Sequence, residues 1–157
     1  MESDELRLAS EYHRGYEDGK RNAKPTPMVH CLEGIRSVYL SGPMSGVEQN
    51  NAGMFARWHA WLRECGISDV FDPAYEWMAD DRDFPHEEYL RRTIHQLTRQ
   101  EGYDCIIMLP GWQTSEGAVT EMTVADACGI RVLMGEVIVK DGVCYLEVSD
   151  PKRLGEV

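Results

Sequence analysis

A glutamate lies two helical turns inside a segment that opens with small hydroxyl-bearing and glycine residues. The segment is Ser115-Glu116-Gly117-Ala118-Val119-Thr120-Glu121, and it follows the apolar run 105–109 and the turn Pro110-Gly111-Trp112. Unpaired N–H groups at a helix start attract an anion, whereas the carboxylate of Glu121 would repel one. Glu121 is therefore better placed to meet the group that carries the phosphate. The pattern indicates an enzyme for a phosphorylated or sugar-bearing small molecule.

Several of these residues also have a purely structural interpretation. Ser115 can act as a helix N-cap, and capping uses the same geometry as phosphate binding. Trp112 can stack on a base or plug its own loop, and Tyr39 can be a core aromatic residue. Asn51 is more typical of a helix cap than of a ligand contact. These alternatives remain open at the level of the sequence.

Composition and charge exclude some classes of partner. The chain has 157 residues, of which 43% are hydrophobic and 27% charged, and its formal net charge is −11. This length and composition are typical of one globular domain. No basic stripe is available to neutralise a nucleic-acid backbone, so a nucleic-acid polymer is not an expected partner. A mononucleotide or nucleoside remains compatible with this charge.

The cysteines and the apolar runs suggest a cytoplasmic protein. Five cysteines are widely spaced, without a Cys-x-x-Cys pair or a histidine at a zinc-ligand spacing. We therefore expect reduced, buried thiols, no metal and no cofactor. The N-terminal residues are acidic and contain no apolar signal region, and no run is long enough to cross a bilayer. No membrane partner is expected.

The N-terminal part, residues 1–34, is predicted to be a helical arm and a linker. Residues 3–22 form a polar helix with a thin apolar stripe, which Gly15 and Gly19 weaken, and the Pro-containing segment 24–27 ends it. So thin a stripe suits an appendage that packs on a neighbour, such as a second subunit, although partial disorder is an alternative. The tyrosines of this arm predict a homo-oligomer.

The remainder, residues 35–157, is predicted to be an α/β domain in which strands and helices alternate. Strands are expected at 38–40, 70–71, 105–109 and 131–134, helices at 52–65, 85–100 and 115–128, and a hairpin from 136–139 to 143–147 through Asp141-Gly142. Such alternation predicts a parallel sheet covered by helices, a flavodoxin-like or Rossmann-like three-layer fold.

Three loops are expected to converge on one site, because the ligand of such a sheet lies at the carboxyl ends of its strands. These loops are 41–46, 72–75 and 110–117. An acid-rich segment after Asp72-Pro73, about ten residues long, suggests a lid or binding loop. The predicted substrate-binding residues are Ser41, Gly42, Pro43, Met44, Ser45, Gly46, Gly111, Trp112, Ser115 and Gly117.

Five motifs follow one another from about Ser37 to Leu133. They are Val38-Tyr39-Leu40-Ser41-Gly42-Pro43-Met44-Ser45-Gly46, Asn51 with Phe55, Asp72-Pro73-Ala74, Asp104 through Leu109-Pro110-Gly111-Trp112, and Ser115-x-Gly117-x-x-x-Glu121 with Ala125 and Gly129. Together they resemble the nucleoside 2-deoxyribosyltransferase-like superfamily, and they look most like its phage-associated branch of unknown function (DUF4406-like). The last two motifs, in this order, are the specific part of the resemblance.

The resemblance implies roles for particular residues. Glu121 would attack or shield C1′ of a ribose or deoxyribose, and Tyr39 would orient it. Ser115 and the first loop would hold a 5′-phosphate in the branch that uses nucleotides. Breaking an N-glycosidic bond builds positive charge at C1′, which a fixed carboxylate stabilises or bonds to. Water as acceptor gives hydrolysis, and a second base gives transfer.

One departure from the superfamily pattern concerns the second acid. The superfamily usually has an aspartate on the helix before the third strand, where this chain has Thr93. Asp72 is our candidate catalytic substitute, beside the loop acids Asp80, Asp81 and Asp83; His95 is a weaker one. If no acid substitutes, we expect a nucleotide-binding protein without turnover, and the resemblance to the phage-associated branch implies a phage-encoded protein that sequesters its ligand. The base, the sugar and the need for a 5′-phosphate remain open.

Overall fold

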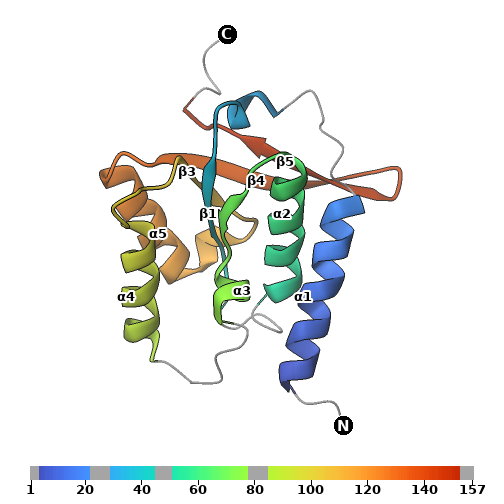
Figure 1. The fold of residues 1–157 in the computed structure, drawn as a ribbon, viewed down its shortest axis with the longest axis horizontal. Helices are drawn as coiled ribbons and strands as arrows, with labels where there is room; N and C mark the ends of the chain where they lie inside the picture. The colour runs from blue at the N-terminus through green and yellow to red at the C-terminus, as the bar shows by residue number, and fades with distance from the viewer. Residues whose placement is uncertain (1–3, 22–28, 45–50, 78–84, 153–157) are drawn as a thin grey trace.

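A computed structural model of the protein describes residues 4–21, 29–44, 51–77 and 85–152 (Figure 1). In chain order the elements are α1 (Asp4–Arg21), η1 (Val29–Leu32), β1 (Ser37–Ser41), α2 (Ala52–Glu64), β2 (Asp69–Phe71), α3 (Pro73–Trp77), α4 (His86–Leu97), β3 (Cys105–Met108), η3 (Trp112–Thr114), α5 (Glu116–Ala127), β4 (Arg131–Lys140) and β5 (Val143–Ser149). The predicted helices and strands are therefore confirmed, apart from the division of β4, with ends that differ by a few residues.

The strands form a curled, mostly parallel sheet in the order β2-β1-β3-β4-β5. The first four strands run parallel, and β5 returns antiparallel to β4. The predicted hairpin turn is confirmed: Asp141 and Gly142 both have positive φ angles, 54° and 75°, as a tight turn between twisted strands requires. The fold is thus a mixed α/β fold, as predicted.

The strand β4 differs from the prediction in being one continuous strand where two segments were expected. Gly135 lies at the junction of those segments, and a Cβ atom there would lie 2.9 Å from the Trp58 ring. The missing side chain lets the indole of α2 pack directly against the strand, so pairing continues through the glycine.

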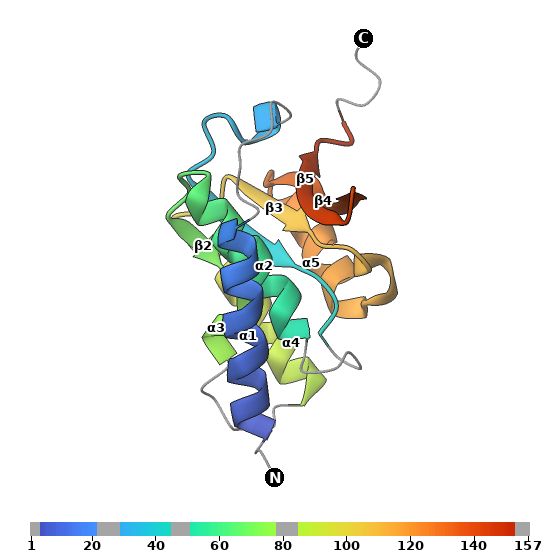
Figure 2. The same cartoon turned by 90° about the vertical axis from the view of Figure 1, so that its right-hand side faces the viewer.

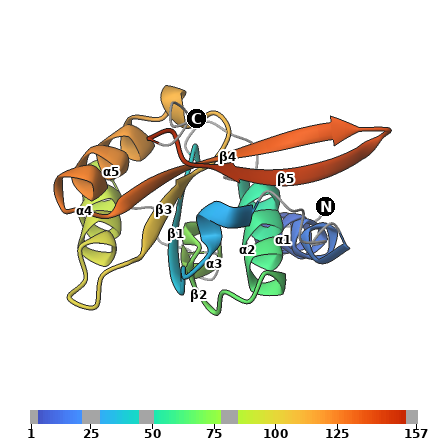
Figure 3. The ribbon, with the colours of Figure 1, turned by 90° about the horizontal axis from the view of Figure 1, so that it is seen from above.

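Helices cover both faces of the sheet (Figures 2 and 3). In β1, Val38 and Leu40 point into the cluster formed with α2, whereas Tyr39 points into the cluster formed with α4 and α5. This alternation is the period of two of a strand that is buried on both faces. It places Tyr39 on the same side of the sheet as α5.

The N-terminal helix α1 packs on α2 of its own chain, which corrects the expectation that it projects toward a neighbour. Gly15 and Gly19 make this contact: a Cβ on either would lie 2.0 Å from the carbonyl oxygen of Gly53 or 2.2 Å from that of Arg57. The two glycines, expected to weaken the helix, bring two backbones together. Tyr12 is consequently buried in the core.

The segment after β2 also differs from the prediction, because residues 73–77 form the short helix α3 where a loop was expected to begin. The candidate acids Asp80, Asp81 and Asp83 lie outside the described residues, as does the predicted linker 24–27. None of the helices in the described ranges combines the length and apolar character that a bilayer crossing needs.

Candidate active site

Glu121 lies on the inner face of α5, where its side chain is only 8% exposed. The helix begins at Glu116 because Ser115 adopts an extended conformation and its Oγ accepts a hydrogen bond of 3.2 Å from the Ala118 N–H. Ser115 is therefore an N-cap, as one of its two interpretations held. This cap fixes the point from which α5 carries Glu121 toward β1.

Both carboxylate oxygens of Glu121 are held by hydroxyl groups of β1. Ser41 Oγ donates to Oε1 at 2.9 Å, and the Tyr39 hydroxyl donates to Oε2. The donors are two residues apart and therefore lie on one face of the strand. The structure thus places Tyr39 at Glu121, where the resemblance implied an orienting residue.

Burial governs the ionisation of this cluster. It raises the pKa of Glu121 to about 7, against the lowering effect of the bonds from Tyr39 and Ser41. Burial, and after it the Glu121 charge, raises the pKa of Tyr39 well above its ordinary value, so the phenol keeps its proton. The Tyr39 hydroxyl also lies 3.3 Å from the Thr93 carbonyl oxygen. When Glu121 is protonated it can donate to Tyr39, which then donates to Thr93.

A cavity of about 380 Å³ opens beside Glu121, within the size range of small-molecule sites. Its walls come from the loop after β1, the start of α3, one face of α4 and the start of α5. The lining residues are Gly42, Met44, Pro73, His86, Tyr89, Leu90, Thr93, Thr114, Ser115, Glu116, Gly117, Ala118 and Glu121. The structure therefore brings four predicted binding residues, Gly42, Met44, Ser115 and Gly117, to the predicted catalytic glutamate.

Other predicted binding residues lie elsewhere. Gly111 and Trp112 line a separate hollow with residues 134–137, so the ring of Trp112 is not a wall of the Glu121 cavity. Pro43 lies beside Gly111, because its Cγ would be 3.3 Å from a Cβ on that glycine, and it is not among the residues that line the Glu121 cavity. Ser45 and Gly46 are outside the described residues.

Asn51 holds the first loop and does not cap α2. It has a left-handed backbone with a φ of 61° and makes no side-chain cap bond. Its Nδ2 donates to the Pro43 carbonyl oxygen at 3.0 Å. The amide thereby fixes the residues that precede Met44 in the cavity wall.

Asp72, the candidate second acid, bonds to other parts of the chain through both carboxylate oxygens. Its Oδ1 accepts from the N–H groups of Ala74 and Tyr75 at the start of α3. Its Oδ2 accepts from the Tyr12 hydroxyl at 2.6 Å and lies 3.0 Å from Nδ1 of His59. These contacts join α1, α2 and α3, and Asp72 is not among the residues that line the cavity.

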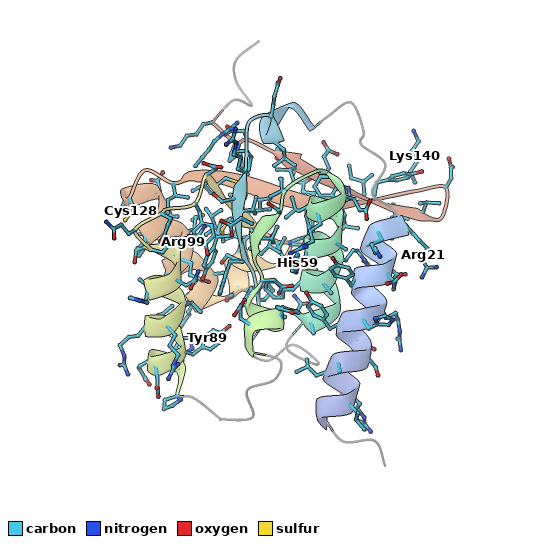
Figure 4. All side chains as sticks on the ribbon, viewed as in Figure 1. Arg21, His59, Tyr89, Arg99, Cys128 and Lys140 are labelled. Carbon is cyan, nitrogen blue, oxygen red and sulfur yellow. The ribbon has the colours of Figure 1, made fainter. Side chains whose placement is uncertain are left out.

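Sequence reasoning missed the contribution of α4 to the cavity. His86, Tyr89, Leu90 and Thr93 all line it. Their spacing of three, four and seven residues marks one face of a helix, which was the available signal. The Tyr89 hydroxyl lies 2.8 Å from Met44 Sδ, and burial together with the Glu121 charge raises its pKa. Figure 4 shows Tyr89 extending from α4 toward the middle of the molecule.

In the part of the chain that the structure describes, no three His, Cys, Asp or Glu side chains form a group able to hold a metal ion.

A family model described as a domain of unknown function (DUF4406) matches residues 36–134, from β1 into β4. No curated protein and no solved structure matches the chain.

Proposed function

The chain belongs to the family of this domain of unknown function, DUF4406, and from its site we propose an N-glycosidase or 2-deoxyribosyltransferase-like enzyme for nucleosides or nucleoside 5′-monophosphates. One observation carries the proposal. Glu121 is a buried carboxylate on the wall of a ligand-sized cavity, and β1 holds both of its oxygens. A side chain oriented by two donors is suited to chemistry at a fixed atom of a ligand.

The proposed reaction uses Glu121 at C1′ of the sugar. A carboxylate oxygen stabilises the positive charge that develops at C1′ or forms a bond to it, while the bond from C1′ to the base nitrogen breaks. The electron pair of that bond leaves with the base, which takes up a proton from an acidic side chain of the cavity wall. Attack of water or of a second base on C1′ then releases Glu121. Tyr39 and Ser41 keep the carboxylate in place throughout.

The position of the cavity in the sheet supports this proposal. The strand order is the one found in flavodoxin-like doubly wound sheets, in which ligands bind where the connections from neighbouring strands diverge. Here those strands are β1 and β3, and the cavity contains Met44 after the first and Ser115 after the second. We therefore infer a flavodoxin-like fold and a relation to the nucleoside 2-deoxyribosyltransferase-like superfamily.

A second candidate function is nucleotide binding without turnover. One observation favours it: Asp72, the expected substitute for the helix aspartate, instead caps α3 and binds Tyr12. Among the described residues of the cavity wall, Glu116 and His86 are the other candidate proton donors besides Glu121 and Tyr89. If neither protonates the leaving base, the site binds its ligand and releases nothing.

Replacing Glu121 by glutamine distinguishes the proposed enzyme from a protein that binds nucleotides without turnover. For an enzyme, Glu121→Gln lowers base release by at least about a hundredfold, because a neutral amide cannot stabilise the cationic sugar. The measurement is chromatography of free base from a panel of nucleosides and monophosphates. Glu87→Gln, an exposed change in the first turn of α4, is the matched control and keeps full activity.

Each outcome of this comparison decides between the candidates. Full turnover in Glu121→Gln would show that Glu121 is not the catalytic carboxylate. A wild-type protein that binds ligand in calorimetry but never releases base would favour the binding function. In that case Glu121→Gln should bind an anionic ligand equally well or slightly better, because a like charge has been removed.

A further inference from the structure

Beyond Met134, the edge of β4 that faces β3 has no neighbouring strand among the described residues. β3 pairs with β4 only from Arg131 to Met134, whereas β5 follows the other edge of β4 as far as Lys140. The hairpin therefore extends past the rest of the sheet, as Figure 3 shows. Natural proteins usually protect such an edge, because its unpaired N–H and C=O groups can pair with another strand.

Apolar side chains on both faces of this segment are left uncovered. Val139 is 67% exposed, and Ile138, on the opposite face, is 39% exposed. The turn at Asp141-Gly142 has two residues, so Lys140, which flanks it, exchanges its backbone hydrogen bonds with β5. Alternation along the strand then directs the N–H and C=O groups of Val137 and Val139 to the free edge. This edge can therefore form a regular antiparallel ladder with a second strand.

The charges along this edge are self-complementary. The segment Glu136-Val137-Ile138-Val139-Lys140 has an acid at one end, a base at the other and three apolar residues between them. When two copies of it pair antiparallel with Ile138 opposite Ile138, each Glu136 lies opposite Lys140 of the second copy. Each Val137 then lies opposite Val139 of the second copy, so every side chain of the segment meets a favourable partner.

Within one chain, Glu136 faces a charge of its own sign. It lies opposite Glu147 of β5, and like charges directly opposite each other destabilise a sheet. The ion pairs among the described residues include neither of these glutamates nor Lys140. In the antiparallel pairing, Lys140 of the second copy lies beside the two acids and compensates their charge.

A hollow of about 470 Å³ leaves room for the second strand. It lies along Gly135, Glu136 and Val137, and the loop 110–113 bounds its other side. In the antiparallel register the turn of the second copy enters this hollow, because its Asp141 lies opposite Gly135. The loop after β3 therefore does not close the edge of β4.

We propose that two copies of this chain join edge to edge through β4, in an antiparallel pairing centred on Ile138. Such an interface is isologous, since the same residues of both copies meet around a two-fold axis. It continues the sheet of one copy into that of the other. The formal net charge of −11 opposes the association of two copies in general, so a segment whose charges cancel across the interface is where association is least opposed.

Charge reversals test this register. Glu136→Lys and Lys140→Glu each place like charges opposite each other when two identical copies pair, whereas the double variant restores opposite charges with an unchanged net charge. Arg7→Glu, an exposed reversal on α1, is the control for the change in net charge. Sedimentation equilibrium from micromolar to millimolar protein, at low salt, gives the dissociation constant of each variant, and cooperative unfolding in urea shows that the variant is folded.

We expect wild type to form a dimer, and each single reversal to raise its dissociation constant by at least about tenfold, because two ion pairs become two like-charge pairs. The double variant and Arg7→Glu should both stay within about threefold of wild type. An equimolar mixture of the two single variants should form heterodimers more readily than either variant pairs with itself, because their reversed charges complement each other.

Amide hydrogen exchange of wild type tests the pairing without any substitution. The amides of Val137 and Val139 should exchange at least about tenfold more slowly at concentrations that form the dimer than at concentrations that give the monomer. The amide of Ile138, which faces β5, is the internal control and should change less.

Four results would overturn the proposal. The first is a wild type that stays monomeric at millimolar concentration. The second is a dimer that neither single reversal weakens, since its interface would lie elsewhere. The third is weakening by the single reversals without recovery in the double variant or in the mixture, since the register would then be wrong. The fourth is exchange of the Val137 and Val139 amides at the same rate in monomer and dimer, which decides the question even if a reversal prevents folding.

Discussion

Glu121 is held between two opposed influences. Burial favours its neutral form, whereas the hydroxyl groups of Tyr39 and Ser41 favour the carboxylate, and the pKa of about 7 is their balance. A nucleophile or cation stabiliser must be ionised, so this balance leaves a useful fraction of carboxylate at neutral pH. Without the two donors, burial alone would leave Glu121 mostly protonated and unsuited to the proposed role.

The raised pKa of Glu121 predicts how stability depends on pH. The folded protein binds the proton more tightly than the unfolded chain, so the stabilisation is complete below pH 4.5 and is lost as pH rises through about 7. The change from 4.5 to about 7 corresponds to about 3 kcal/mol. Glu121→Gln cannot ionise, so its free energy of unfolding should exceed that of wild type at pH 8 by up to about 3 kcal/mol, with a smaller advantage at pH 4.5.

Urea unfolding of both proteins at several pH values measures this difference. The comparison between proteins cancels the titration of the other acids, which both share. A stability difference that stays constant from pH 4.5 to pH 8 would show that the pKa of Glu121 is not raised by folding.

Asp72 shows how a second buried carboxylate acquires a different role. It is 1% exposed, and both of its oxygens accept hydrogen bonds from the chain itself. Arg63 Nε donates to Nε2 of His59 at 3.3 Å, and Nδ1 of the same ring lies 3.0 Å from Oδ2 of Asp72. The hydrogen bonds of Asp72 therefore connect α1, α2 and α3 and leave the carboxylate in a structural role.

At the scale of elements, β1 is the part of the fold on which the site depends most. It is paired on both sides, with β2 and β3, so its position is constrained along its whole length. Tyr39 and Ser41 reach Glu121 from this strand, and the loop that follows supplies Gly42 and Met44 to the cavity. Donors on a rigid central strand hold the carboxylate more precisely than loop donors do.

The contact between α1 and α2 gives a prediction with its own matched control. Gly15→Ala should destabilise the protein by about 1–3 kcal/mol, although alanine favours helices, because its Cβ would meet the Gly53 carbonyl oxygen at 2.0 Å. Gly53→Ala lies across the same interface, but its Cβ would be 3.5 Å from the nearest atom, an ordinary contact. That variant should be neutral or more stable by about 0.4–1 kcal/mol.

The free energy of unfolding in urea distinguishes these two variants. A single cooperative transition with an unchanged slope would show that α1 unfolds together with the rest of the domain. Equal stability of the two alanine variants would contradict the close packing of α1 on α2.

At the scale of the whole molecule, the oligomeric state remains a prediction. The tyrosines of α1 that motivated it face inward, where Tyr12 and Tyr16 pack beside His59 and Tyr75. A homo-oligomer therefore has to use another surface. Exposed apolar side chains remain on the β4–β5 hairpin, at Ile138, Val139 and Val143. We expect sedimentation equilibrium to give a mass above the 17.9 kDa of one chain, and a clean monomer would contradict the prediction.

Local signals in the sequence were sufficient to predict most of the helices and strands and their order; the short helix α3 and the continuity of β4 were not predicted. The short apolar run of β1, the Asp141-Gly142 turn and the cap at Ser115 each depend on a few neighbouring residues. The carboxyl ends of parallel strands lie at the same edge of the sheet. This rule was enough to predict that Gly42, Ser115 and Glu121 lie together.

The contacts that those side chains make depend on tertiary packing. The glycines of α1 cost helix stability in isolation and become contact points once α2 lies against them. From the sequence, the Asp72 side chain could face either the site or the core. In the structure it accepts a hydrogen bond from the hydroxyl group of Tyr12, a residue distant in sequence, and is buried. The pKa of Glu121 depends on burial, which no local pattern reports. Contacts between distant segments, and the loss of water that accompanies them, exist only after the chain has folded.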